Sequence, residues 1–138
     1  MADAVTTQVI ADGDKIAVVK ITNLSDGSGE SAVAKIDVSA LNSSSNGDDC
    51  TRVTINQIWY DIAGMRISLD WNASTNVVCL ALGGAPSLGT QTGYMDFRSF
   101  GGITNNAGSG INGDLLLTTS GHTNLDHYTI LLELSKSY

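Results

Sequence analysis

The sequence has few basic residues, and this scarcity limits the partners that the protein can bind. Seven Lys and Arg residues stand against 14 Asp and Glu residues, which gives a formal net charge of −7. Binding to nucleic acid or to an anionic membrane requires clustered basic side chains. The basic residues here are spread along the chain. We therefore expect no nucleic acid and no membrane as partner, and a basic protein surface as the better electrostatic match.

Cysteine and long hydrophobic runs are also scarce. Cys50 and Cys79 are the two cysteines, and we expect reduced thiols because a chain of 138 residues can fold without a disulfide. No apolar run approaches the ~18 residues that span a bilayer. The first ten residues lack the basic and apolar regions of a secretory signal. We expect a chain that is neither exported by a signal peptide nor anchored in a membrane.

The central stretch, Val53–Leu82, shows most clearly what the sequence does contain. Hydrophobic residues at every second position from Met65 to Trp71 alternate with polar ones, which is typical of a strand with one buried face. Ala63-Gly64 and Asn72-Ala73-Ser74 supply turn residues on either side. The stretch therefore predicts three strands joined by two turns.

Short strands separated by turn clusters occupy the rest of the chain, and no segment shows a helical period. About nine strands at this spacing are typical of a sandwich or barrel. Several loops exceed hairpin length, which favours crossovers between sheets. We predict an all-β fold, a single-domain antiparallel β-sandwich over residues 1–138, jelly-roll-like. The remaining expected strands are Ala4–Ile10, Lys15–Leu24, Glu30–Val38, Gly93–Phe100, Asp114–Ser120 and His127–Leu134, with one helical turn possible at Ser39–Leu41 and a surface loop over Gly83–Thr92.

Periodicity also assigns the core. Five residues on the apolar faces of their strands are expected in one core: Leu69, Trp71, Leu80, Ile130 and Leu132.

The aromatic residues bear on one possible function. Trp59 shares a period-two face with Val53 and Ile55, which predicts that it too is buried. Exposed Trp59, Tyr60 and Trp71 could form a sugar-stacking platform, but the periodicity does not favour it.

One glycine motif matches a cofactor-binding pattern, but the segments on either side of it do not. Gly108–Gly113, GSGING, matches the dinucleotide-binding pattern G-x-G-x-x-G. That pattern requires a strand before it and a helix after it, whereas here a Gly/Asn-rich loop precedes and a strand follows. We expect no cofactor.

The remaining polar clusters predict no catalytic or metal site. Ser120, His122, Asp126 and His127 crowd one turn, whereas a catalytic triad draws its residues from separated loops. The acidic pairs in the loops do not fit a calcium-binding loop, and no His/Cys set has zinc spacing. We expect no enzyme, no catalytic residue and no metal.

Most of the chain resembles a known group of proteins. The segment SFGGITNNAGSGINGDLLLTTSGHTNLDHYTILLELSKS, the opening MADAVTTQVIADGDKIAVVKITNLSDGSGESAVAKIDVS and the segment QIWYDIAGM are similar to small virion structural proteins of tailed bacteriophages of marine and freshwater bacteria. The resemblance implies a non-enzymatic structural part of the particle. Gly83–Gln91 does not align.

The resemblance implies a capsid decoration or cement protein that stabilises the shell, located in the virion and assembled in the host cytoplasm. A neck, tail or baseplate protein is the first alternative, and a module that binds host glycan is the second. The expected partners are other virion proteins, above all the major capsid protein, and further copies of the chain, as a homo-oligomer such as a trimer. Partner contacts are predicted at Ala2, Val5, Thr7, Val9, Ile103, Asn105, Asn106 and Ile111. Residues Ala2–Thr7 are expected to be dispensable for the fold.

Overall fold

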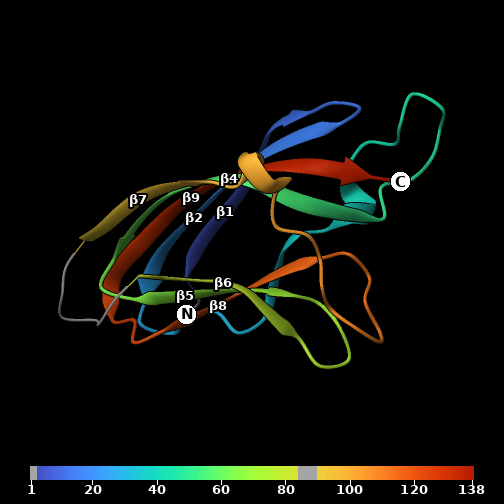
Figure 1. Ribbon diagram of the computed structural model, residues 1–138. Coiled ribbons are helices and arrows are strands. Elements are labelled where there is room, and N and C mark those ends of the chain that lie inside the picture. Colours follow the sequence, from blue (N-terminus) through green and yellow to red (C-terminus); the bar gives the residue numbers. More distant parts are fainter. Residues whose placement is uncertain (1–2, 84–89) are drawn as a thin grey trace.

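The computed structural model describes residues 3–83 and 90–138, and in this part the chain forms two antiparallel sheets (Figure 1). No helix among these residues is long and apolar enough to cross a membrane. The strands are β1 (Ala4–Asp12), β2 (Ile16–Asp26), β3 (Val33–Ile36), β4 (Arg52–Ala63), β5 (Arg66–Trp71), β6 (Val77–Gly83), β7 (Thr90–Asp96), β8 (Leu115–Ser120) and β9 (Asn124–Ser137), with 3-10 turns η1 (Val38–Ala40) and η3 (Arg98–Phe100).

The strand order of the two sheets follows a nested pattern. The five-stranded sheet has the order β1-β2-β9-β4-β7 and the four-stranded sheet the order β3-β8-β5-β6. Pairing therefore runs from the inside outward: β5 with β6, β4 with β7, β3 with β8 and β2 with β9. β1 adds to the outside of β2. The prediction of an all-β antiparallel sandwich is confirmed.

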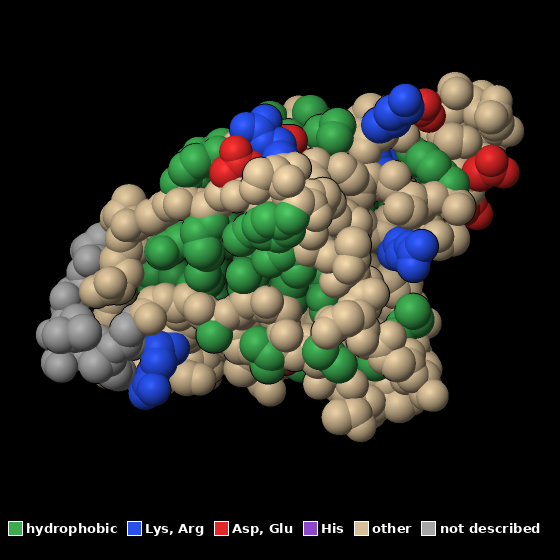
Figure 2. All heavy atoms as spheres, in the orientation of Figure 1, with side chains coloured by type: hydrophobic (Ala, Val, Ile, Leu, Met, Phe, Trp, Pro, Cys, Tyr) green, Lys and Arg blue, Asp and Glu red, His purple; other side chains and the backbone are tan. Residues whose placement is uncertain are grey.

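The core lies between the two sheets because alternate residues of each strand point inward. Leu69, Trp71, Ile130 and Leu132 have no exposed surface, as the period-two pattern predicts. Leu80 is only half-buried, so its assignment to the core was partly wrong. It belongs to the edge strand β6, and Figure 2 shows hydrophobic side chains between β6 and β7 on the side facing the viewer.

An irregularity in β4 overturns the prediction for Trp59. The pairing of β4 with β9 shifts register between Ile55 and Gln57, which marks a β-bulge. Because one extra residue reverses the faces of everything after it, Ile58 is buried while Trp59 turns outward and is 37% exposed. The interpretation of Trp59 as a core residue was therefore wrong.

Several boundaries differ from the predicted ones. β3 is half the expected length, and Ala32, just before it, has a φ of 49° that no strand residue adopts. The strand expected at Gly93–Phe100 begins earlier, at Thr90, and gives way to η3 at Arg98. Within the loop expected at Gly83–Thr92, residues 84–89 lie outside the described part. The helical turn is confirmed as η1, where the side chain of Asp37 accepts a hydrogen bond from the Ser39 amide.

Candidate functional site

Strand β1 forms an exposed edge of the sandwich. It lies at the edge of the five-stranded sheet, and every residue from Ala4 to Ala11 is exposed. Val5, Val9 and Ile10 are 45%, 51% and 50% exposed. Both faces of the strand are therefore exposed, and β3, at the edge of the opposite sheet, spans only four residues. Thr7 and Val9 border a hollow of about 130 Å³ beside Ile36.

Most of β1 lacks the features that block pairing with another strand. Sheet edges in soluble proteins are usually blunted by charged residues, proline or a covering segment. The segment Ala4–Ala11 contains neither a charged residue nor a proline. The register shift between Val9 and Ala11 is its one irregularity.

The beginning of β1 is fixed by a buried carboxylate. Asp3 is 8% exposed and accepts hydrogen bonds from the side chains of Asn23 (3.0 Å) and Ser25 (3.3 Å) and from the Gly29 amide (3.1 Å). Burial opposes ionisation of Asp3, but the hydrogen bonds from Asn23, from Ser28 and from the amides of Gly29 and Asp26 lower its pKa below the ordinary value. The residue expected to be dispensable is thus an anchor for the loop after β2.

A buried polar network extends from this anchor into the core. Asn23 also donates to Oε1 of Glu30 (2.7 Å), which accepts a second bond from the Tyr128 hydroxyl (2.6 Å). Lys35 forms an ion pair with the other oxygen of Glu30. Burial raises the pKa of Tyr128, and the bond to Glu30 raises it further. Apart from the side-chain oxygen of Asn23, which has no hydrogen-bond partner within the described residues, these groups satisfy one another, so the network fits a structural role.

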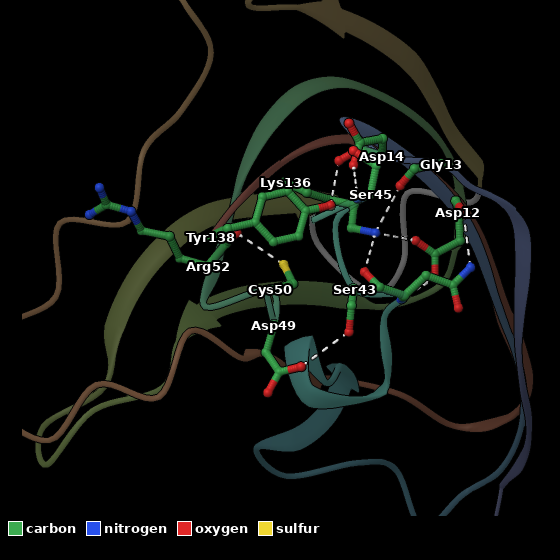
Figure 3. Close-up of polar contacts among 11 residues, drawn as sticks. Asp12, Gly13, Asp14, Ser43, Ser45, Asp49, Cys50, Arg52, Lys136 and Tyr138 are labelled. Atoms are coloured by element: carbon green, nitrogen blue, oxygen red, sulfur yellow. Dashed lines mark hydrogen bonds and ion pairs between the residues drawn. The ribbon is translucent and has the colours of Figure 1, made fainter. Parts of the chain in front are cut away.

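The end of β1 is fixed by a buried ammonium group (Figure 3). Nζ of Lys136 donates to Oδ1 of Asp12 (2.5 Å) and to the carbonyl oxygens of Gly13 (2.9 Å) and Asn42 (2.7 Å). All three donors of the ammonium group are therefore satisfied. Asp12 in turn accepts from the Asn42 amide at 2.7 Å. The cluster joins the end of β1, the loop before Cys50 and β9.

A hollow of about 580 Å³ lies next to this cluster. Asp14, Ser44, Asp48 and Tyr138 are among the residues that line it, and the Ser45 amide donates to Asp14 at 2.8 Å. No group of three or more His, Cys, Asp or Glu side chains within residues 3–83 and 90–138 is placed to hold a metal ion. Hydroxyl and carboxylate groups line the hollow.

The residues predicted as partner contacts fall into two separate groups. Val5, Thr7 and Val9 lie on β1, while Ala2 lies outside the described residues. Ile103 is half-buried against the core and pairs with Ile55 of β4, which β2 and β9 separate from β1.

The rest of the second group belongs to the loop before β8. Asn105 is half-buried, and its side-chain oxygen accepts a hydrogen bond from the Ala107 amide (3.0 Å). Asn106 and Ile111 are exposed. Loop and β1 therefore do not form one continuous surface.

The other sequence candidates do not assemble into a reactive site. The Gly108–Gly113 loop leads directly into β8, and Gly113 lies against the Thr51 carbonyl, where a β-carbon would not fit. His122 contacts Thr119 at 3.3 Å, whereas Asp126 accepts from the Thr123 amide and hydroxyl.

Sequence reasoning missed one exposed feature on the outer face of the five-stranded sheet. Trp59 of β4 stacks on Tyr94 of β7, with ring centroids 5.2 Å apart and an interplanar angle of 27°. Tyr94 is 49% exposed. The sequence did not predict this pair, because no local sequence pattern indicates the bulge that turns Trp59 outward.

Comparison with protein-family models, with curated proteins and with solved structures found no match for this chain. The contacts of the molecule itself therefore have to carry any functional argument beyond the fold.

Proposed function

We propose that the protein is a non-enzymatic structural component of a tailed-phage particle, most simply a capsid decoration or cement protein, and that β1 is its docking strand. The observation that carries this proposal is an edge strand whose exposed segment Ala4–Ala11 is uncharged and whose two ends are fixed by hydrogen bonds, at Asp3 and at Asp12. The sequence resemblance to small virion proteins supplies the biological setting.

The pinned ends of β1 suit strand addition. An extended segment that joins a sheet edge gains backbone hydrogen bonds, and a preformed edge pays little ordering entropy when it binds. Asn23 and Lys136 hold the two ends while Val5, Thr7 and Val9 remain accessible. The bound strand would come from another copy of the chain or from a capsid protein.

Charge supports a basic partner. The net charge of −7 would favour approach to a basic shell surface, and the neutral stretch Ala4–Ala11 adds no repulsion where the strands meet. The major capsid protein is the proposed partner, and the trimer expected from the resemblance is the proposed oligomer.

We further infer that the sandwich is a jelly roll with β1 added. Without β1, the strand orders of the two sheets are β2-β9-β4-β7 and β3-β8-β5-β6. A long hairpin of eight strands that folds over on itself produces this order. Jelly rolls occur in viral capsid proteins and also in lectins. The fold is compatible with the proposed role but does not by itself imply it, because one fold carries many functions.

The experiment uses two exposed valines as a matched pair. Val9 on β1 is 51% exposed and Val78 on the edge strand β6 is 59% exposed. Val9→Lys places a charge on the docking edge, and Val78→Lys places the same charge on the other sheet. Purified wild type and both variants are added to particles that lack the protein, and bound copies are measured after sedimentation.

We expect Val9→Lys to lose at least about tenfold in affinity for the particle while Val78→Lys binds as wild type does. Equal binding by both variants would remove β1 from the attachment. A wild-type protein that never binds capsids would sink the decoration role. Counting copies by quantitative mass spectrometry of virions separates the sites, because hundreds indicate the shell and far fewer indicate neck or tail.

A further inference from the structure

The outer face of the five-stranded sheet carries an apolar strip between two polar rows. Trp59 is paired with Tyr94 on one side and with Leu131 on the other, which makes a row across β7, β4 and β9. The next row contains Thr92, Asp61 and Thr129, and the row on the opposite side contains Asp96, Gln57 and Glu133.

The two aromatic rings are held in place by the neighbouring polar row. The Tyr94 hydroxyl donates to the side-chain oxygen of Gln57, and the amide nitrogen of Gln57 donates to Glu133. Gln57 is only 6% exposed. Since Tyr94 is fixed by this relay and Trp59 stacks on Tyr94, the exposed rings form a preorganised surface.

A hollow of about 230 Å³ opens beside Trp59, bordered by Asp61, Thr92, Thr129 and Leu131. Its wall is mostly apolar, and its polar groups stand at one side. Thr92 donates to Asp61 at 3.2 Å, so this carboxylate is oriented as well.

We propose that this face is a carbohydrate-binding site for neutral saccharides, centred on Trp59 and Tyr94. A pyranose ring has an apolar C–H face that packs on an aromatic ring, and hydroxyl groups around its rim. The sheet surface matches this arrangement, because the aromatic rings lie in the middle and the oxygen acceptors of the two polar rows lie beside them.

Charge selects the kind of sugar. Asp61 and Glu133 lie in the two rows on either side of the rings. A carboxylate accepts hydrogen bonds at several positions, so each can take a sugar hydroxyl in addition to its present partner. Asp96 is already engaged by Arg98 through two bonds of 2.9 and 2.8 Å. Acidic sugars would meet the two carboxylates and be repelled, whereas neutral hexoses donate to them.

The site is independent of the proposed docking strand. β1 is separated from the strip by β2, and β1 and the strip occupy different parts of the sheet. A structural protein of a particle surface could therefore hold a neighbouring protein through β1 and still present Trp59 to a glycan.

The test is a titration of the purified full-length protein with linear oligosaccharides of glucose, of galactose and of N-acetylglucosamine, with oligogalacturonate as the acidic comparison. Intrinsic fluorescence is a suitable readout, because Trp71 is fully buried and Trp59 is the exposed tryptophan. We expect at least one neutral series to bind and oligogalacturonate to bind more weakly.

Variants separate the site from the rest of the surface. Trp59→Ala should weaken binding of the neutral sugar by about tenfold or more, measured for this variant by calorimetry. Val78→Ala removes an exposed side chain on the other sheet and should not change the affinity. Trp59→Phe keeps a ring and should retain most of the affinity, which guards against a folding defect in the alanine variant.

Three results would overturn the proposal. The first is that no neutral series binds at millimolar concentration. The second is that Trp59→Ala binds the sugar as tightly as Val78→Ala does. The third is that Trp59→Ala reduces attachment to particles without affecting the binding of any sugar. The last result would assign the strip to a protein partner.

Discussion

Removal of the buried ammonium group of Lys136 tests whether β1 is held as described. In Lys136→Met a side chain of similar length remains, but Asp12 loses its counter-charge and the carbonyls of Gly13 and Asn42 lose their donor. Breaking a buried pair on one side costs about 3–5 kcal/mol. The Lys136 side chain is fully buried and that of Asp12 is 12% exposed, so water can partly solvate the remaining carboxylate. We therefore expect the low end, about 3 kcal/mol.

The assay is urea unfolding at constant pH, with hydrogen exchange of the β1 amides alongside. Lys15→Met is the matched control, because Lys15 is exposed in the neighbouring turn and should change stability by less than about 0.5 kcal/mol. The second variant, Asp12→Asn with Lys136→Met, removes both charges and should recover part of the loss. Equal stability of Lys136→Met and Lys15→Met would refute the reasoning.

The same group predicts a pH dependence. Burial alone would lower the pKa of Lys136, but its hydrogen bond to Asp12, together with Tyr138, raises it above the ordinary 10.5. The folded state therefore keeps a proton that the unfolded chain releases, so this stabilisation is complete below pH 10.5 and is lost as the pH rises above it. Lys136→Met should lack that part of the alkaline loss.

Three further outcomes are expected. Leu132→Ala removes a side chain with no exposed surface and should cost about 2–5 kcal/mol; a melting temperature within a degree or two of wild type would mean that the face assignment is wrong. The pKa of Asp3 lies below its ordinary 3.8 in the fold, so stability should fall as the pH drops below about 4, and Asp3→Asn should flatten that fall; an unchanged slope would contradict it. Cys50 and Cys79 should both titrate as thiols after denaturation. In the folded protein Cys79 should react slowly, because burial and the charge of Asp70 raise its pKa to about 12. An intact mass two units low would reveal a disulfide.

Local patterns predicted much of the fold. Alternation in the segment around Leu69 and in the last strand identified inward faces correctly, because period-two burial is a property of each strand by itself. The free cysteines also followed from chain length and are confirmed. Val5 and Val9 were predicted as contacts because their segment has little core-facing pattern, and both are exposed on β1.

What the sequence could not predict depends on partners far along the chain. Lys136 and Asp12 are separated by 124 positions, and nothing near either residue indicates that they meet. The bulge after Ile55 changes which face Trp59 occupies, yet bulges arise from strand pairing and leave no reliable local pattern. The exposure of β1 was therefore partly predictable, and the aromatic strip was not.

The central place of β9 has a consequence for synthesis. β9 is the last strand of the fold, and it lies between β2 and β4 in the middle of the five-stranded sheet. That sheet cannot close until residues 124–137 have left the ribosome, and such distant pairings form slowly. A chain broken before β9 would leave the edges of β2 and β4 open and prone to aggregate. A copy that stops before β9 therefore lacks the strand that joins β2 to β4, even though β1 and β2 are already complete.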